Sequence, residues 1–302
     1  MSPIAIALVV TSTFTHAFWN LIGKRRSPTA AFFLLASLVM ILALAPLIIY
    51  HRRALPLVPN SVWVLLAATG GSQALYYAAL AGAYRYGQLS VAYPLARSLP
   101  AMLVAVVTAL LGLGEPLNLT GIIGITLVVM GCLCIPLVSF RQIRLSHYLN
   151  PCCGLAVLAA CGTTGYTIID SQALGQLRAL PDLDLSTAAL ALFFMGLEFI
   201  TTCLWLGLYV AAVPGERAAF SDLRRSALGS AAITGLMIGG TYGLVLVAMG
   251  FVSNVSYLAA FRELSIPLGA LLGITLQKEP APLPKIVGIS VVLVGLLLVG
   301  LA

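Results

Sequence analysis

Four charged residues stand inside long apolar stretches of this sequence, where each of them needs a physical reason. Arg97 and Arg262 carry planar guanidinium groups, which can hold a carboxylate through two parallel hydrogen bonds. Glu198 and Glu263 could pair with these arginines or take up protons. A charge in the middle of a bilayer costs at least about 2.5–3.5 kcal/mol. If these stretches cross a membrane, the four residues therefore either bind a ligand or hold helices together.

Polar and aromatic side chains accompany these charges at helical spacing. His16, Trp19 and Asn20 share one stripe of an apolar segment, and Tyr93 lies one turn before Arg97. The remaining candidates of this kind are Gln73, Tyr77, Tyr166, Tyr242 and Tyr257. A tyrosine ring suits apolar or aromatic ligands, and its hydroxyl suits polar ones. The pattern predicts the walls of a ligand-binding cavity, although a lone histidine among apolar residues is more often a hydrogen-bonded packing residue.

The composition places these residues in a lipid bilayer. Of the 302 residues, 61% are hydrophobic and 8% are charged, whereas soluble domains carry roughly 25% charged residues. So few charges cannot cover the surface of a water-soluble protein of this length. The net charge of +7 does not indicate a nucleic-acid partner, because the basic residues lie in short loops rather than on one face. We expect an integral membrane protein.

Apolar runs between charged or Pro/Gly-containing segments predict ten transmembrane helices. Each run is long enough to cross the hydrocarbon core as a helix and too long and continuous for a barrel strand. The fold is therefore expected to be all-α. The predicted spans are 4–23, 29–50, 61–83, 90–113, 118–139, 151–170, 186–211, 227–250, 253–276 and 284–301.

The second half of the sequence repeats the first. Residues 124–131 match residues 288–295 closely, with one glycine at each end of both segments. Similar matches recur in the same order along both halves, which divides the chain into five-helix units at 1–145 and 146–302. An odd number of spans places the second unit upside down in the membrane. Inverted repeats around a central cavity are typical of alternating-access transporters; a duplicated structural protein is the alternative.

The repeated unit also carries the motifs of a known family. A Glu-Pro turn at 115–116 and again at 279–280 precedes a helix with two glycines seven residues apart. With Ala-Tyr-Pro-Leu-Ala-Arg-Ser at 92–98 and Phe-Arg-Glu-Leu-Ser at 261–265, the sequence resembles the EamA branch of the drug/metabolite transporter superfamily, especially its YddG-type exporters. The resemblance implies ten helices around a central cavity in a bacterial inner membrane. It departs from the family at 277–279, where the second turn lacks its glycine.

These observations together predict a secondary transporter that exports small metabolites, amino acids including aromatic ones, by alternating access. The alternatives are a multidrug or organic-cation efflux transporter, and a membrane enzyme or scaffold without transport activity. No catalytic motif, phosphate-binding loop or metal-ligand pair stands in the sequence, so we expect no enzyme, metal or cofactor. The oligomeric state stays open, and a monomer is compatible with the sequence.

Basic residues in the predicted loops indicate the orientation of the chain. If the N-terminus lies outside, the outer loops hold the three basic residues Arg52, Arg53 and Arg178. The inner loops then hold eleven: Lys24, Arg25, Arg26, Arg85, Arg141, Arg144, Arg217, Arg224, Arg225, Lys278 and Lys285. The positive-inside rule therefore predicts that both termini lie outside, whereas the family resemblance favours cytoplasmic termini.

Overall fold

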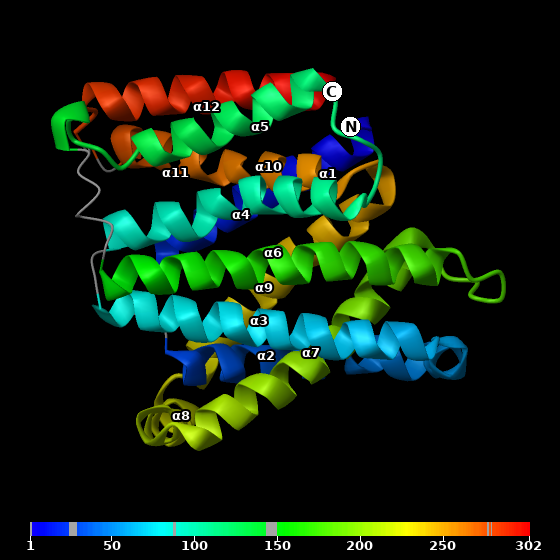
Figure 1. Ribbon diagram of the computed structural model, residues 1–302. Helices are drawn as coiled ribbons and strands as arrows, with labels where there is room; N and C mark the ends of the chain where they lie inside the picture. The colour runs from blue at the N-terminus through cyan, green and yellow to red at the C-terminus, as the bar shows by residue number, and fades with distance from the viewer. Residues whose placement is uncertain (1, 24–28, 87–88, 143–149, 277, 279) are drawn as a thin grey trace.

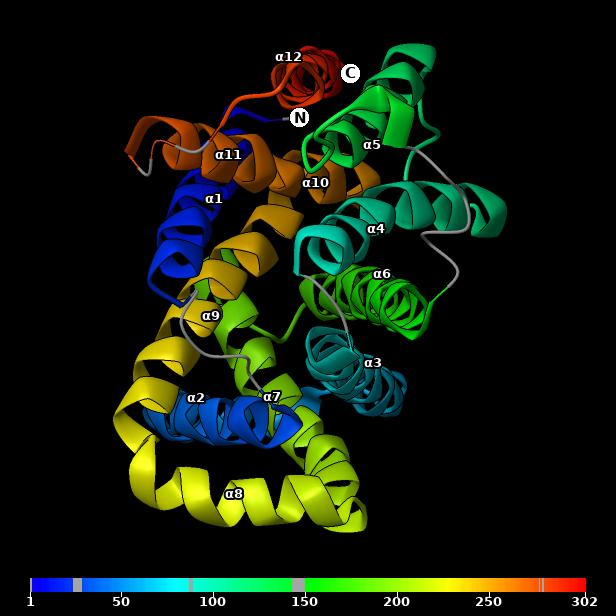
Figure 2. The same cartoon turned by 90° about the vertical axis from the view of Figure 1, so that its left-hand side faces the viewer.

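The computed structural model shows a helical bundle, and it contains no strand in the part of the chain that it describes. It describes residues 2–23, 29–86, 89–142, 150–276, 278 and 280–302, leaving out the side chains of residues 16–23, 84, 89–95, 142, 273 and 276. Most helices run in roughly the same direction, one above the other in Figure 1. The two ends of the chain lie close together in both views (Figures 1 and 2).

The helices follow one another with short connections. The first half contains α1 (Pro3–Gly23), α2 (Ala30–Tyr50), η1 (Arg52–Leu57), α3 (Asn60–Tyr86), α4 (Leu89–Leu111), α5 (Leu119–Cys134) and η2 (Phe140–Gln142). The second half contains α6 (Pro151–Arg178), α7 (Thr187–Ala212), α8 (Pro214–Ser226), α9 (Leu228–Ala248), η4 (Met249–Phe251), α10 (Val255–Phe261), η5 (Arg262–Leu264), α11 (Ser265–Leu276) and α12 (Leu283–Leu301).

The described helices are apolar enough to cross a membrane. Seven helical segments have both the length and the hydropathy of a membrane span, and three further apolar segments are shorter: Pro3–Thr15, Ala96–Leu111 and Leu119–Cys134. The prediction of an all-helical integral membrane protein is confirmed at this level. The number of ten spans remains a prediction.

Side-chain caps set the start of five of the described helices, among them α10, where Asn254 accepts a hydrogen bond from the Ser256 N–H. Thr29, Asn118, Asn150 and Ser186 each accept a hydrogen bond from the backbone N–H three residues further on. Such a cap satisfies one of the donors that the first turn of a helix leaves without an intrahelical partner. The polar residue that ends each connection therefore also starts the next helix.

Helix α6 is longer than the sequence pattern predicts. The apolar run suggested a span that ends at Asp170, but the helix continues to Arg178. Ala173, Leu174 and Leu177 are buried in this extension and continue the inward face of the helix. Asp170 therefore lies two turns before the end of the helix, and it is fully buried.

The predicted span at 253–276 is interrupted at its charged residues. Helix α10 ends at Phe261, the 3-10 turn η5 follows, and α11 begins at Ser265. Pro267 stands just after the turn, and its ring nitrogen cannot donate the α-helical bond to the carbonyl of Glu263. A proline is among the identifiable causes of such a break, so this local sequence explains why Arg262 and Glu263 lie at a discontinuity.

The helices of the two halves pack against one another. Helix α3 packs along α6, α5 packs along α12, and α7 contacts both α2 and α3; the pairing of α5 with α12 is visible at the top of both views (Figures 1 and 2). The α5–α12 contact depends on glycines. A Cβ atom added to Gly131 would lie 2.7 Å from the carbonyl oxygen of Gly288, and one added to Gly288 would lie 2.7 Å from that of Gly131.

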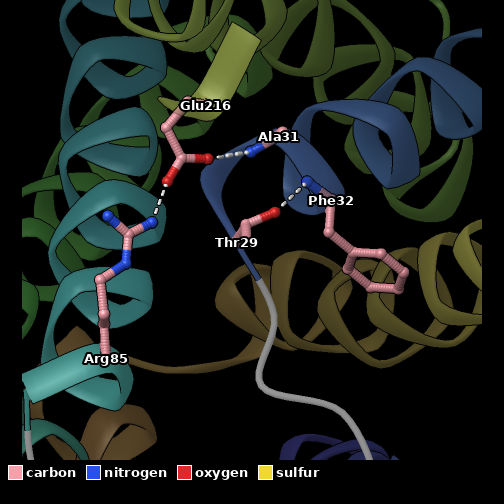
Figure 3. A network of polar contacts seen from close by, with 5 residues as sticks. All are labelled: Thr29, Ala31, Phe32, Arg85 and Glu216. Carbon is pink, nitrogen blue, oxygen red and sulfur yellow. Dashed lines mark hydrogen bonds and ion pairs between the residues drawn. The ribbon is translucent and has the colours of Figure 1, made fainter. Parts of the chain in front are cut away.

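Helix α8 is a short helix that the span pattern did not include, and one buried carboxylate attaches it to two other helices. Glu216 accepts a hydrogen bond from the Ala31 N–H at the start of α2 (N···O 2.9 Å) and forms an ion pair with Arg85 near the end of α3 (N···O 2.7 Å). Figure 3 shows both contacts beside the Thr29 cap of α2. Since Glu216 is almost fully buried, these contacts fix the end of the bundle opposite the two termini (Figure 1).

Candidate functional site

A small polar pocket lies where α4, α6 and the interrupted segment α10–η5 meet. Among the described residues, its lining consists of Ala96, Arg97, Pro100, Thr163, Thr167, Ala259, Arg262 and Glu263. The space inside holds no more than about one water molecule. In this conformation the pocket is therefore too small for a ligand larger than water, and a larger ligand requires the helices to separate.

The pocket lining contains two guanidinium groups and one carboxyl group. Arg97 donates a hydrogen bond from Nη2 to Ser265 Oγ (3.0 Å), which directs it towards the segment that carries Glu263. Glu263 is 4% exposed, and the charges of both Arg97 and Arg262 act on it. Its Oε2 atom has no hydrogen-bond partner among the described residues. The lining thus carries more positive than negative charge, which favours an anionic ligand group.

A second polar cluster is built around two buried carboxyl groups, Asp170 of α6 and Glu198 of α7, which we call the carboxyl pair. Tyr242 of α9 bridges them, because its hydroxyl contacts Asp170 Oδ2 and also lies 2.9 Å from Glu198 Oε1. Thr69 Oγ1 donates to Asp170 Oδ1 (2.5 Å) and Gln73 Nε2 donates to Glu198 Oε1 (3.1 Å). The five side chains come from four helices and lie in the buried centre of the bundle.

An aromatic layer borders the carboxyl pair. The ring of Tyr166 meets those of Tyr76 and Tyr242 edge to face, with centroid separations of 6.0 and 5.7 Å. Tyr77 lies further along α3, where it stacks on Phe33 of α2 with the ring centroids 4.6 Å apart. Edge-to-face and offset-stacked rings pack tightly, so in this conformation these tyrosines fill the space beside the two carboxyl groups.

The candidate site residues from the sequence lie in several different places in the structure. The structure brings Arg97, Arg262 and Glu263 together at the pocket, and it joins Gln73, Glu198 and Tyr242 with Tyr166 in the neighbouring cluster. Tyr77 contacts Phe33 instead, and Tyr257 lies against Gly121 of α5 rather than in the pocket lining. The side chains of His16, Trp19, Asn20 and Tyr93 lie outside the described ones.

Two members of the carboxyl cluster were not among the candidate residues. Asp170 was taken to lie near the end of a span, and Thr69 is an ordinary residue of an apolar helix. One signal was available for Asp170, since it continues the stripe of Thr163, Tyr166 and Thr167 at helical spacing. The side-chain hydrogen-bond partners of Glu198 are Gln73 and Tyr242, and both come from other helices.

The described residues contain no group of three or more His, Cys, Asp or Glu side chains that could hold a metal ion. The side chains of the two clusters offer chemistry of their own: the guanidinium groups can bind anions, and the carboxyl and hydroxyl groups can exchange protons.

Comparison with known proteins agrees with this architecture. Residues 3–137 match the model of the EamA-like transporter family, part of the drug/metabolite transporter superfamily. The EamA resemblance predicted from the motifs is confirmed there, and with it a membrane-transporter type of fold. The YddG-type branch remains a prediction.

A known structure matches this chain over its whole length. The match is to a crystal structure and covers 100% of this chain and 98% of the other, with a TM-score of 0.66. The two sequences are 15% identical, so the similarity shows the common fold alone. No curated protein sequence matches the chain.

Proposed function

We propose that this protein is a secondary transporter that exports small carboxylate-bearing metabolites, amino acids including aromatic ones, by alternating access. The observation that carries this proposal is the convergence of Arg97, Arg262 and Glu263 on one small pocket inside an EamA-like bundle. Charged groups within a membrane bundle are expensive and commonly mark a substrate pathway. A substrate carboxylate would bind the guanidinium groups, and a substrate ammonium would bind Glu263.

The helix contacts support two inverted five-helix repeats. If α1, α2, α3, α4 and α5 correspond to α6, α7, α9, α10–α11 and α12, each main contact has a counterpart: α3 with α6 corresponds to α9 with α1, and α3 with α7 to α9 with α2. The glycine contacts follow the same exchange, because Gly124 lies against Gly295 just as Gly288 lies against Gly131. This symmetry favours ten spans, in which α1 and α5 cross the membrane like α6 and α12.

The interrupted helix supports the assignment of the pocket as the substrate site. In transporters with inverted repeats, substrates bind near the middle of the bilayer at helices that are broken. Here the break falls at Arg262–Leu264, the segment that supplies two of the charged pocket residues. A break also gives the segment freedom to reorient when the pocket opens.

The charges at one end of the bundle support an orientation of the chain in the membrane. Helix α8 carries exposed Arg217, Arg224 and Arg225, and it lies at the end opposite the two termini (Figure 1). We therefore assign the α8 end to the cytoplasm and both termini to the outside of a bacterial inner membrane. A monomer contains both charged clusters within one chain.

Transport into liposomes tests the proposal. Purified protein is reconstituted and supplied with a panel of labelled amino acids, nucleosides and quaternary ammonium cations. Amino-acid uptake would support the proposal. Uptake of quaternary cations alone would refute it in favour of a cation efflux transporter. Uptake of no class would refute transport of these metabolites. Arg97→Lys should lose most amino-acid uptake and Arg97→Gln more, because a single ammonium cannot reproduce a two-pronged hydrogen bond to a carboxylate.

Melting temperatures of the same variants separate substrate binding from helix pairing. If Arg97 acts mainly as the counter-ion of Glu263, Arg97→Gln strands that carboxylate at a cost of about 3–5 kcal/mol, and adding Glu263→Gln restores stability. If Arg97 binds substrate, Arg97→Gln melts near the wild type and still fails to transport. The matched control is Arg217→Gln on the exposed side of α8. Normal uptake by Arg97→Gln would remove Arg97 from the site.

A further inference from the structure

We propose that the carboxyl pair, Asp170 and Glu198 bridged by Tyr242, is a proton-binding site separate from the Arg97–Arg262–Glu263 pocket and electrostatically linked to it. The existence of the site follows from geometry alone. Its part in transport rests on the function proposed above.

The hydroxyl of Tyr242 contains one proton but faces two carboxyl groups. It contacts Asp170 Oδ2 and Glu198 Oε1, and a hydroxyl can donate only one hydrogen bond while it accepts others. If both carboxyl groups were ionised, Tyr242 would donate to one and turn an oxygen lone pair towards the other. Such a contact is repulsive in a buried site. The observed arrangement therefore requires a proton on one of the two carboxyl groups.

The hydrogen-bond donors around the carboxyl pair can stabilise one negative charge but not two. Thr69 and Gln73 each donate one hydrogen bond to the pair, and Glu198 Oε2 has no partner among the described residues. Asp170 is 0% exposed and Glu198 is 1% exposed. A buried carboxylate without enough donors is costly, so a second ionisation would have to be balanced from elsewhere. The pair thus holds one proton in this conformation and releases it when the helices separate.

The other ionisable groups near the pair come from several helices. The phenols of Tyr77 and Tyr166 and the thiol of Cys203 lie on α3, α6 and α7. Helix α1 packs on α9 and contains His16, whose side chain lies outside the described ones. Arg97 on α4 faces Glu263. Among the described residues, Arg262 is a cation whose charge acts on Asp170.

Arg262 links the pair to the pocket. Its charge acts on Asp170 and also on Glu263, and it lines the pocket itself. Thr167 of the pocket lies on α6 one turn before Asp170. A substrate carboxylate bound to Arg262 cancels the positive potential that stabilises ionised Asp170, so it favours proton binding at the pair. By thermodynamic reciprocity, the proton favours carboxylate binding by the same factor.

Infrared spectroscopy on the intact, detergent-solubilised protein tests the site without any substrate. The carbonyl stretch of a protonated carboxyl group should be present near neutral pH and disappear on alkaline titration. Asp170→Asn and Glu198→Gln should each remove this titrating band, because the remaining acid then faces a neutral amide and no longer shares a proton. Glu115→Gln is the control that should leave the band in place.

Three results would overturn the site: no titrating carboxyl band in the wild type, a band that persists unchanged in both amide variants, or a band that disappears in Glu115→Gln. The amide variants imitate the protonated form and are expected to fold. If either fails to do so, Tyr242→Phe takes its place and should shift the pH at which the band titrates; an unshifted titration would also overturn the proposal.

Uptake measurements then separate this proposal from the proposed function. For whichever amino acid the liposome panel identifies, wild-type affinity should rise as the pH falls through the titration of the band. In Asp170→Asn this dependence should disappear. Equal pH dependence in both proteins would overturn the linkage. A titrating band without uptake of any amino acid would preserve the proton site and refute the amino-acid transporter.

Discussion

The contact between α8 and the start of α2 tests how burial changes the contribution of a polar contact to the stability of the fold. Ala31 is fully buried, and its N–H belongs to the first turn of α2, where no helical carbonyl can accept it. Glu216 Oε2 is its acceptor at 2.9 Å. Glu216→Ala removes that acceptor and leaves a buried donor without a partner, which costs about 1–3 kcal/mol. Losing the negative charge at the N-terminus of α2 adds about 0.3–1 kcal/mol.

The other half of the same contact should matter far less. The side chain of Arg85 is 57% exposed, and that of Glu216 is 3% exposed. An ion pair with one partner in solvent contributes about 0–1 kcal/mol. Arg85→Gln should therefore change stability only slightly, and Glu216→Gln should fall between the two variants because its amide oxygen can still accept from Ala31.

Thermal unfolding of the purified variants in one detergent, followed by loss of the monodisperse peak in size-exclusion chromatography, measures this order. Arg217→Gln, on the exposed face of the same helix, is the control and should melt like the wild type. If Arg85→Gln destabilises the protein as much as Glu216→Ala, the ion pair rather than the buried N–H carries the contact, and the reasoning is wrong.

Two further predictions follow from packing and charge. Gly288→Ala should lower the melting temperature, because its Cβ would lie 2.7 Å from the backbone oxygen of Gly131 and overpacking costs about 1–3 kcal/mol. The control is Gly240→Ala, whose Cβ would have nothing within 4 Å and which should be neutral or stabilising. Equal effects of the two substitutions would contradict the close contact of α5 with α12. With both termini outside, a C-terminal phosphatase fusion should be active and a C-terminal green fluorescent protein fusion dim; the reverse pattern would refute the count of basic residues.

The sequence alone was sufficient for the all-helical class of the fold and for its membrane setting. In a bilayer every backbone N–H and C=O must be satisfied internally, so long apolar runs have few structural options. Local chemistry explains further details, such as the break before Pro267 and the caps at Asn118 and Asn150. The EamA motifs also lie within continuous segments, and for that reason they could be recognised without a structure.

Only the tertiary structure decided which polar residues meet. Tyr242 lies 72 residues from Asp170 and 44 from Glu198 along the chain, and no local pattern relates such positions. Tyr257 and Tyr166 looked alike in sequence, yet one packs against Gly121 and the other borders the carboxyl pair. Helical periodicity determines the face of a helix on which a side chain lies. The packing of several helices determines which faces come together, and here it joins two carboxyl groups through a single hydroxyl.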